Sequence, residues 1–188
     1  MTNGGFEAPV TTDPSFDNVT GNMITGWTIA PNKNVDLVRG FFDPSEGKQS
    51  IDLNGGSPGE IYQDLTTVVG KKYKIQFDLA GNPFPDGVDP GAYIKHLDLS
   101  WGGSFLSSYA FDTLGHGPHS MGWETITAFA TATSTSSRLD FKSTSGSVSG
   151  PALDNVHVDA VTPEGSSLLS LCGGLVAAGF AALRRRRK

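Results

Sequence analysis

Apolar and polar residues alternate along much of this chain. The clearest run is Lys72 to Leu79, where an apolar set alternates with a polar one: Tyr73, Ile75, Phe77 and Leu79 against Lys72, Lys74, Gln76 and Asp78. A period of two places each set on its own face of a β-strand. The run therefore predicts a strand with one buried and one solvated face, as in an antiparallel sheet.

Weaker versions of this pattern recur between glycine-containing turns such as Asn54-Gly55-Gly56 and Val69-Gly70-Lys71. They predict further strands at 35–38, 49–53, 60–68, 96–101, 124–131, 138–142 and 153–158. The opening Asn3–Glu7 also looks like a strand. No stretch before residue 160 has a helical period. About eight strands in one domain predict an all-β, antiparallel two-sheet β-sandwich, most simply a jelly roll.

The distribution of charge along the chain limits the classes of molecule that we expect it to bind. The chain carries −5 overall, but the last five residues are all basic and Glu164 is the only acid beyond residue 162, so residues 1–162 carry −9. Phosphate backbones are bound by clustered lysine and arginine on the folded part of a protein. The acidic body therefore excludes nucleic acid as an expected partner and disfavours anionic polymers, whereas neutral glycans and cations remain.

The composition changes abruptly after residue 160. Leu168 to Leu183 contains no charged residue, and Arg184 to Lys188 follow at once. The run is at the short limit for a bilayer span, and the basic cluster predicts a cytoplasmic C-terminus. We therefore expect a domain at 1–160 and, at 161–188, a linker, a transmembrane helix and a basic tail. The single cysteine, Cys172, lies inside that apolar run.

The tail resembles the PEP-CTERM sorting signals of bacterial surface proteins. The resemblance rests on Pro163 and Glu164, the apolar segment and the basic cluster that begins with Arg184 and Arg185. It implies export to the cell surface or extracellular matrix, and an exosortase-type enzyme as partner. Gly165 stands where that pattern has a second proline. A sorting tail requires an export signal, so we expect a signal peptide upstream of Met1.

An ordered set of short motifs spans the body. It comprises Asn3-Gly4-Gly5-Phe6-Glu7, Gly26-Trp27-Thr28, Val35-Asp36-Leu37-Val38, residues 45–53, residues 73–83 and Gly150-Pro151-Ala152-Leu153-Asp154-Asn155-Val156. This series resembles the DUF642 family, called choice-of-anchor C when it carries a bacterial sorting tail. The resemblance implies a galactose-binding-like jelly roll at the cell surface that associates with polysaccharide.

The same resemblance implies a structural calcium ion. In similar carbohydrate-binding jelly rolls the Glu of a Gly-Phe-Glu opening and the Asp of a closing Asp-Asn-Val bind calcium, which here are Glu7 and Asp154. Backbone carbonyls of the Glu46-Gly47-Lys48 loop, including that of Lys48, would complete a shell of six to eight oxygens. Alternatively, both carboxylates are strand-end residues hydrogen-bonded to turn amides.

Sugar binding requires exposed aromatic platforms. The candidates are Trp101, Trp123, Tyr93 and Tyr109, each with core packing as the alternative, whereas Trp27 is expected in the core. Long loops at 83–93 and 112–123 are where binding is expected on a sandwich. His116 and His119 are placed in a polar loop, with zinc as the less favoured interpretation.

No catalytic motif is present, and no pair of acids stands out as the pair that glycoside hydrolysis needs. The sequence therefore predicts a non-catalytic extracellular module that binds polysaccharide. Two alternatives remain open: a structural surface or biofilm-matrix protein without a specific ligand, and an enzyme that modifies polysaccharide.

Overall fold

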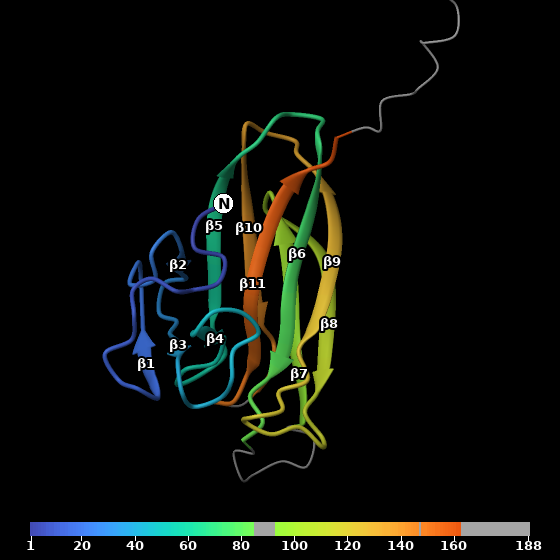
Figure 1. Ribbon diagram of the computed structural model, residues 1–188. Helices are drawn as coiled ribbons and strands as arrows, with labels where there is room; N and C mark the ends of the chain where they lie inside the picture. Colours follow the sequence, from blue (N-terminus) through green and yellow to red (C-terminus); the bar gives the residue numbers. More distant parts are fainter. Residues whose placement is uncertain (85–92, 147, 163–188) are drawn as a thin grey trace, which may run out of the picture.

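The computed structural model of this protein describes residues 1–84, 93–146 and 148–162 (Figure 1). They form eleven strands: β1 (Phe16–Val19), β2 (Thr28–Ile29), β3 (Val35–Val38), β4 (Ser50–Asp52), β5 (Glu60–Thr66), β6 (Lys72–Gly81), β7 (Ile94–Trp101), β8 (Ser104–Asp112), β9 (Glu124–Thr131), β10 (Ser136–Ser143) and β11 (Pro151–Ala160). The strands build two antiparallel sheets that pack face to face, so the predicted all-β sandwich is confirmed.

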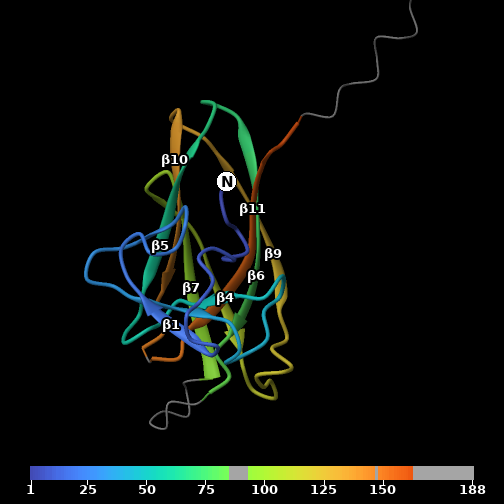
Figure 2. The same ribbon diagram turned by 60° about the vertical axis from the view of Figure 1, so that its left-hand side comes forward.

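The first sheet has the order β1-β3-β4-β11-β6-β9 and the second β2-β5-β10-β7-β8. Figure 2 separates the two layers, with β11, β6 and β9 in one and β5, β10 and β7 in the other. The last strand, β11, lies in the middle of the first sheet between β4 and β6. The C-terminal strand therefore joins the short N-terminal strands to the long hairpins of the middle of the chain.

The alternation from Lys72 to Leu79 does form β6, and its apolar set is buried: Tyr73, Ile75, Phe77 and Leu79 are each at most 8% exposed. The core lies between the two sheets. Phe77 meets Phe141 of β10 edge to face, with ring centroids 5.1 Å apart, and Phe141 in turn contacts Trp27 at 6.2 Å. Trp27 is 2% exposed, as expected of a core residue.

The opening segment is not a strand. Asn3 and Phe6 have φ angles of 52° and 55°, in the left-handed region, where a residue cannot continue a β-strand. The segment instead folds back across the sandwich, and Val156 donates its backbone N–H to the Gly4 carbonyl at 3.0 Å. Phe6 is carried to a fully buried position against Trp27, with ring centroids 5.3 Å apart.

The predicted tail lies outside the described residues. This holds for the transmembrane helix at 168–183 and for Pro163, Glu164, Arg184 and Arg185 of the sorting motif. Within residues 1–84, 93–146 and 148–162, no helix is long and apolar enough to cross a bilayer.

Candidate functional site

Asp154 is a fully buried carboxylate near the start of β11. One of its oxygens, Oδ2, accepts the backbone N–H groups of Ser45 and Glu46, both at 2.9 Å, and Oδ1 accepts the N–H of Asn155 at 2.7 Å. Burial and the neighbouring charge of Glu46 raise the pKa of Asp154 to about 7, against the lowering effect of these three amides. Asp154 thereby fixes the loop that joins β3 to β4.

Glu7 fixes the same loop from the other side. Its Oε1 accepts the backbone N–H groups of Lys48 at 2.6 Å and Gln49 at 2.9 Å. Gly47 lies between these contacts with a φ of +65°, and a β-carbon there would meet Oε1 of Glu7 at 2.2 Å. The contact between Lys48 and the Glu7 carboxylate is thus made by the Lys48 backbone amide.

Three acidic side chains converge on Gly5. A β-carbon built on Gly5 would lie 2.7 Å from Oε2 of Glu46, 3.9 Å from Oδ1 of Asp154 and 3.9 Å from Cγ of Glu7. Within the described part of the chain, however, no three His, Cys, Asp or Glu side chains are already grouped closely enough to hold a metal ion. Acidic side chains from three segments thus approach Gly5, although both Glu7 and Asp154 are already hydrogen-bonded to turn amides.

A bulge in β11 places a second cluster of polar side chains beside the acidic side chains around Gly5. The pairing of β11 with β6 shifts between Asp154 and His157, and Asn155 in the bulge has a φ of 51°. The Asn155 amide donates to Oδ2 of Asp78 at 3.0 Å, while His157 Nε2 lies 2.7 Å from Asn155 Oδ1. A cavity of about 480 Å³ opens over this bulge and is lined by Gly4, Gly5, Glu46, Asn155, His157 and Asp159, among others.

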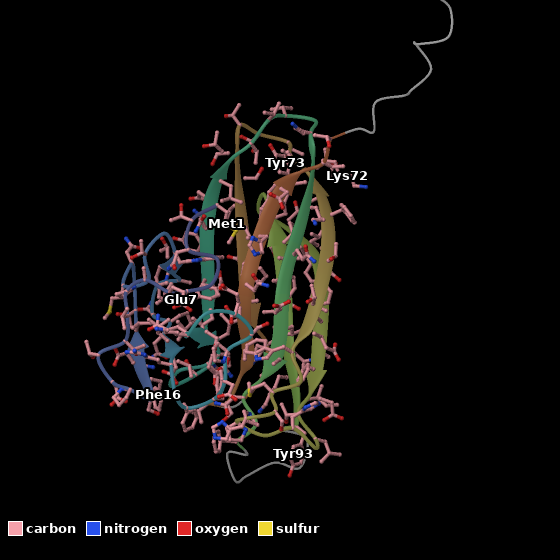
Figure 3. The ribbon with its side chains drawn as sticks, viewed as in Figure 1. Met1, Glu7, Phe16, Lys72, Tyr73 and Tyr93 are labelled. Carbon is pink, nitrogen blue, oxygen red and sulfur yellow. The ribbon has the colours of Figure 1, made fainter. Side chains whose placement is uncertain are left out.

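Aromatic side chains from β1 and two loops pack against one another near Phe16, which Figure 3 labels beside β1, while Tyr93 is labelled at the lower end of the sandwich. Phe41 stacks on Phe84 with ring centroids 4.4 Å apart and an interplanar angle of 27°, and Phe16 lies 5.3 Å from Phe41. Phe16 and Phe84 are 38% and 37% exposed. We call Phe16, Phe41 and Phe84 the loop-end aromatic cluster. Sequence periodicity did not reveal it, because its members come from β1 and from two loops.

Two of the predicted ligand-binding residues lie in the loops at this end. Trp123 is half-buried and donates its Nε1–H to the carbonyl of Asp43 at 3.1 Å, and Asp43 donates its backbone N–H to Pro118 at 2.8 Å. The β8–β9 loop is therefore joined to the loop that carries Phe41. Tyr93 is 38% exposed and stands just before β7.

The other two predicted ligand-binding residues serve the core, which corrects that expectation for them. Trp101 is 6% exposed and packs against Tyr73, with ring centroids 5.6 Å apart. Tyr109 is half-buried and meets Phe77 edge-on at 5.5 Å. Both side chains point between the sheets, because Leu97, the cross-strand partner of Tyr109, and Leu139, the partner of Trp101, are fully buried.

A carboxylate pair does exist, on the outer face of the second sheet. Burial, and then the adjacent Glu60 carboxyl with which it shares a hydrogen bond, raise the pKa of Asp140. The carboxyl groups of glycosidases are separated by about 5–5.5 Å or about 6.5–9.5 Å. A pair in hydrogen-bond contact is closer than either spacing, so we do not assign Glu60 and Asp140 a catalytic role.

The two loop histidines, His116 and His119, contact different partners. His116 Nδ1 lies 3.1 Å from the Ser120 carbonyl, and its ring packs on Phe111. His119 Nδ1 lies 3.2 Å from Oδ1 of Asp43. Each histidine therefore has its own polar partner in an exposed loop.

Two solved structures that resemble this chain in fold are carbohydrate-binding modules. A family 61 module in complex with β-1,4-galactotriose superposes with a TM-score of 0.55 at 15% identity, covering 86% of this chain and 97% of that one. A family 35 module from Clostridium thermocellum gives 0.52 at 13% identity, covering 78% and 99%. At this identity the likeness establishes the fold, a jelly roll of the carbohydrate-binding-module kind.

Comparisons of sequence give more direct information about the family of this chain than the structural likeness does. Halomucin of Haloquadratum walsbyi is 30% identical over 166 residues, which is 83% of this chain but only 2% of that protein, so the chain spans a small fraction of its length. Residues 1–159 match the model of a family described as a protein of unknown function, DUF642. The match covers all of the sandwich except the last residue of β11, and the chain belongs to the DUF642 family.

Proposed function

We propose that this protein is a non-catalytic module that binds polysaccharide outside the cytoplasm. The observation that carries the proposal is the loop-end aromatic cluster, in which Phe41 and Phe84 form a stacked pair whose outer member is 37% exposed. Aromatic rings bury large apolar area with little loss of conformational freedom, which suits the apolar face of a sugar ring. Large exposed apolar groups clustered at loops mark binding sites rather than core.

The ligand class follows from charge and from the neighbours of the cluster. Residues 1–162 carry −9, so we propose a neutral or cationic polysaccharide rather than a sulfated or uronic acid polymer. Trp123 and Tyr93 border the same loops and would supply further contact area, while Asp43 and His119 offer polar groups. Among the solved structures with this fold, the family 61 module holds a galactotriose, and that supports a glycan as the ligand.

The experiment is a binding titration of the whole protein against a panel of neutral and amino-sugar polysaccharides. We expect the double variant Phe41→Ala/Phe84→Ala to bind about tenfold more weakly or worse, since each stacked ring contributes of the order of 1 kcal/mol. The matched control is Phe105→Ala/Phe129→Ala, which removes two exposed rings, 64% and 48% exposed, from strands β8 and β9. Equal affinity of both variants would place the binding surface outside the loop-end aromatic cluster. No binding by the wild type across the panel would instead favour a structural surface or matrix protein.

A calcium ion is proposed at the carboxylates around Gly5. Glu7, Asp154 and Glu46 would hold it. Calcium binds carboxylate and carbonyl oxygens in flexible loops, and these residues and their loop offer such oxygens. What supports it is the approach of three acidic side chains to one glycine, and burial beside Glu46 raises the pKa of Asp154 to about 7. When bound, the ion would neutralise this charge and tie the N-terminal segment, the 45–49 loop and β11 together.

Display at the cell surface is the last part of the proposal. The apolar run 168–183 followed by Arg184 and Arg185 would anchor the module in a membrane, and an exosortase-type enzyme would act near Pro163 and Glu164. Intact-mass analysis of the protein from cells with and without such an enzyme tests this. A mass that includes residues 166–188 in both strains would exclude processing, and Gly165→Pro would show whether the departure from the sorting pattern is the reason.

A further inference from the structure

The chain leaves the sandwich at one defined end. The strand β11 ends at Ala160, and the next residue, Val161, donates its backbone N–H to the carbonyl of Lys72 at 2.8 Å. Figure 1 shows this exit beside the β5–β6 turn, and Figure 3 labels Lys72 and Tyr73 there, opposite the end that carries Tyr93. We call the β5–β6 turn (67–71), the start of β6 and the end of β11 the exit end.

The distance from the exit end to the proposed membrane anchor is short. Six residues, 162–167, separate Val161 from the apolar run that begins at Leu168. Even fully extended they span only about 20 Å. The ten residues of β6 alone run about 33 Å along the sandwich. A body anchored through that run must therefore hold its exit end, and not its loop end, near the bilayer.

The surface at the exit end has the chemistry of a membrane contact. Val68 and Val69 are 62% and 59% exposed at the tip of the β5–β6 turn. Behind them stand Lys71, Lys72 and Lys74, three of the nine lysines and arginines among residues 1–162. The Lys72 ammonium lies 4.6 Å from the centre of the Phe129 ring, which is 48% exposed. One acidic residue, Asp159 of β11, lies across from Lys74 of β6 in the antiparallel pairing of these strands.

The tip is held rigidly. Gly70, with a φ of 78°, permits the tight turn and donates its N–H to the Ala132 carbonyl at 2.8 Å, while Ala132 donates its N–H to Lys71 at 3.0 Å. Val68 donates its N–H to the Tyr73 hydroxyl at 3.0 Å. Two exposed valines are thus presented on a fixed turn with lysines behind them, an arrangement that suits shallow insertion of apolar groups and attraction to lipid phosphates.

We propose that the exit end is a docking surface for an anionic lipid bilayer. Val68 and Val69 enter the headgroup region, and Lys71, Lys72 and Lys74 contact the phosphates. The sandwich then stands end-on with its loop-end aromatic cluster pointing away from the membrane. This inference rests on the membrane anchoring described under the proposed function.

The test uses the full chain in vesicles of phosphatidylcholine with about one third phosphatidylglycerol. The one native cysteine is replaced by Cys172→Ser, and an environment-sensitive fluorophore is placed through Val69→Cys. The matched control carries it through Leu114→Cys, which is 68% exposed in the β8–β9 loop at the opposite end. We expect a blue-shifted emission and quenching by lipid-borne quenchers at position 69 and neither at position 114.

Charge is tested in the same background with Lys71→Gln, Lys72→Gln and Lys74→Gln. Each lysine near an anionic surface shifts binding by about fivefold, so the ratio of docked to undocked protein should fall by about that factor for each substitution. Vesicles of phosphatidylcholine alone should give the unsubstituted protein a loss as large as that of the triple substitution, because they remove the attraction of all three lysines at once.

The outcomes separate the docking from the anchoring. Failure of the chain to float with vesicles overturns both. Flotation with an aqueous signal at position 69 overturns the docking surface and leaves the anchor in place. Equal quenching at positions 69 and 114 also overturns it, because the body would then lie flat or bind without orientation.

Discussion

The backbone N–H of Glu46 donates to the buried carboxylate of Asp154 at 2.9 Å, although the Glu46 side chain carries the same charge as its partner. That side chain lies close enough to raise the pKa of Asp154, in addition to the larger effect of burial. The fold thus holds two like charges beside Glu7 at one place. Such an arrangement costs stability unless a cation is bound or a proton is taken up.

Calcium should therefore stabilise the protein. At a concentration about 100-fold above its dissociation constant, an ion that binds only the folded state adds about 2.7 kcal/mol. For a domain of this size that corresponds to a rise in melting temperature of about 5–10 °C. Thermal unfolding in the presence of calcium and in the presence of chelator measures this rise in melting temperature.

The controls for calcium use side chains of the same strand and the same loop. Asp154→Asn should remove the calcium-dependent rise, whereas Asp159→Asn, on the exposed end of β11, should keep it. In chelator, Glu46→Gln should raise the melting temperature slightly, because it removes the like charge beside Asp154. A response to calcium that survives Asp154→Asn would place the ion elsewhere.

Stability should also depend on pH through Asp52. This carboxylate is 1% exposed, and burial raises its pKa to about 7 despite hydrogen bonds from Asn54, Asn82 and Gly150; Asp36 raises it further. An unfolded aspartate titrates near pH ~3.9. Between about pH 4 and pH 7 the folded protein therefore binds more protons than the unfolded chain, so the free energy of unfolding falls as pH rises through that window.

The measurement is chemical denaturation in chelator at several pH values. The wild type should be more stable near pH 5 than near pH 7.5, and Asp52→Asn should reduce the difference without abolishing it, because burial also raises the pKa of Asp154. Below about pH 4 the trend should reverse, since hydrogen bonding from Arg138 lowers the pKa of Asp64 and that contribution is lost on protonation. An unchanged slope in Asp52→Asn would contradict the assignment.

The sequence predicted strands well wherever one face of a strand is buried. All eight runs that alternate or are continuously apolar became strands, as β6 illustrates. Three strands were missed. β2 has two residues, β1 carries one buried residue, and β8 has serines where apolar residues would reveal a period and faces a bulge between Leu99 and Ser100. Periodicity is lost where few side chains of a strand are buried.

The residues of the candidate sites also fall into some that the sequence indicated and some that it did not. The motif resemblance brought Glu7 and Asp154 to one loop, because motif order in a family reflects a shared fold. It indicated Glu46 only as part of a loop that offers backbone carbonyls, and not for its side chain. It did not indicate Phe41 and Phe84, which no periodic element carries. Trp101 and Trp123 look alike in sequence, and only the register of β7 distinguishes the buried ring from the loop ring.

Gln49 should be a strong determinant of stability. Its side chain is 1% exposed and makes three hydrogen bonds to the N-terminal segment: Nε2 donates to the carbonyls of Phe6 and Pro9 at 2.7 and 3.0 Å, and Oε1 accepts the N–H of Thr11 at 2.8 Å. Removing it leaves backbone groups buried without partners. We expect Gln49→Ala to cost about 2–4 kcal/mol of unfolding free energy.

Gln76 offers the control for Gln49. It lies on the half-buried outer side of β6, and Gln76→Ala should change stability by no more than about 0.5 kcal/mol. Urea unfolding of both variants decides the matter. A similar small loss in the two would mean that the opening segment is not held through Gln49.

Substitutions of Trp101 and Trp123 should have different effects, because Trp101 packs in the core and Trp123 lies at the proposed binding surface. Trp101 fills the core against Tyr73, so Trp101→Ala should cost about 3–5 kcal/mol. Its Nε1 has no hydrogen-bond partner in the described part of the chain, so Trp101→Phe should cost far less. Trp123→Ala removes a hydrogen bond to Asp43 and a loop contact, and should reduce polysaccharide affinity several-fold with a smaller loss of stability. Unfolding and binding titrations on the same three variants measure both quantities. Loss of affinity in Trp101→Phe with full affinity in Trp123→Ala would reverse the assignment of the two residues and move the binding surface away from the loop end.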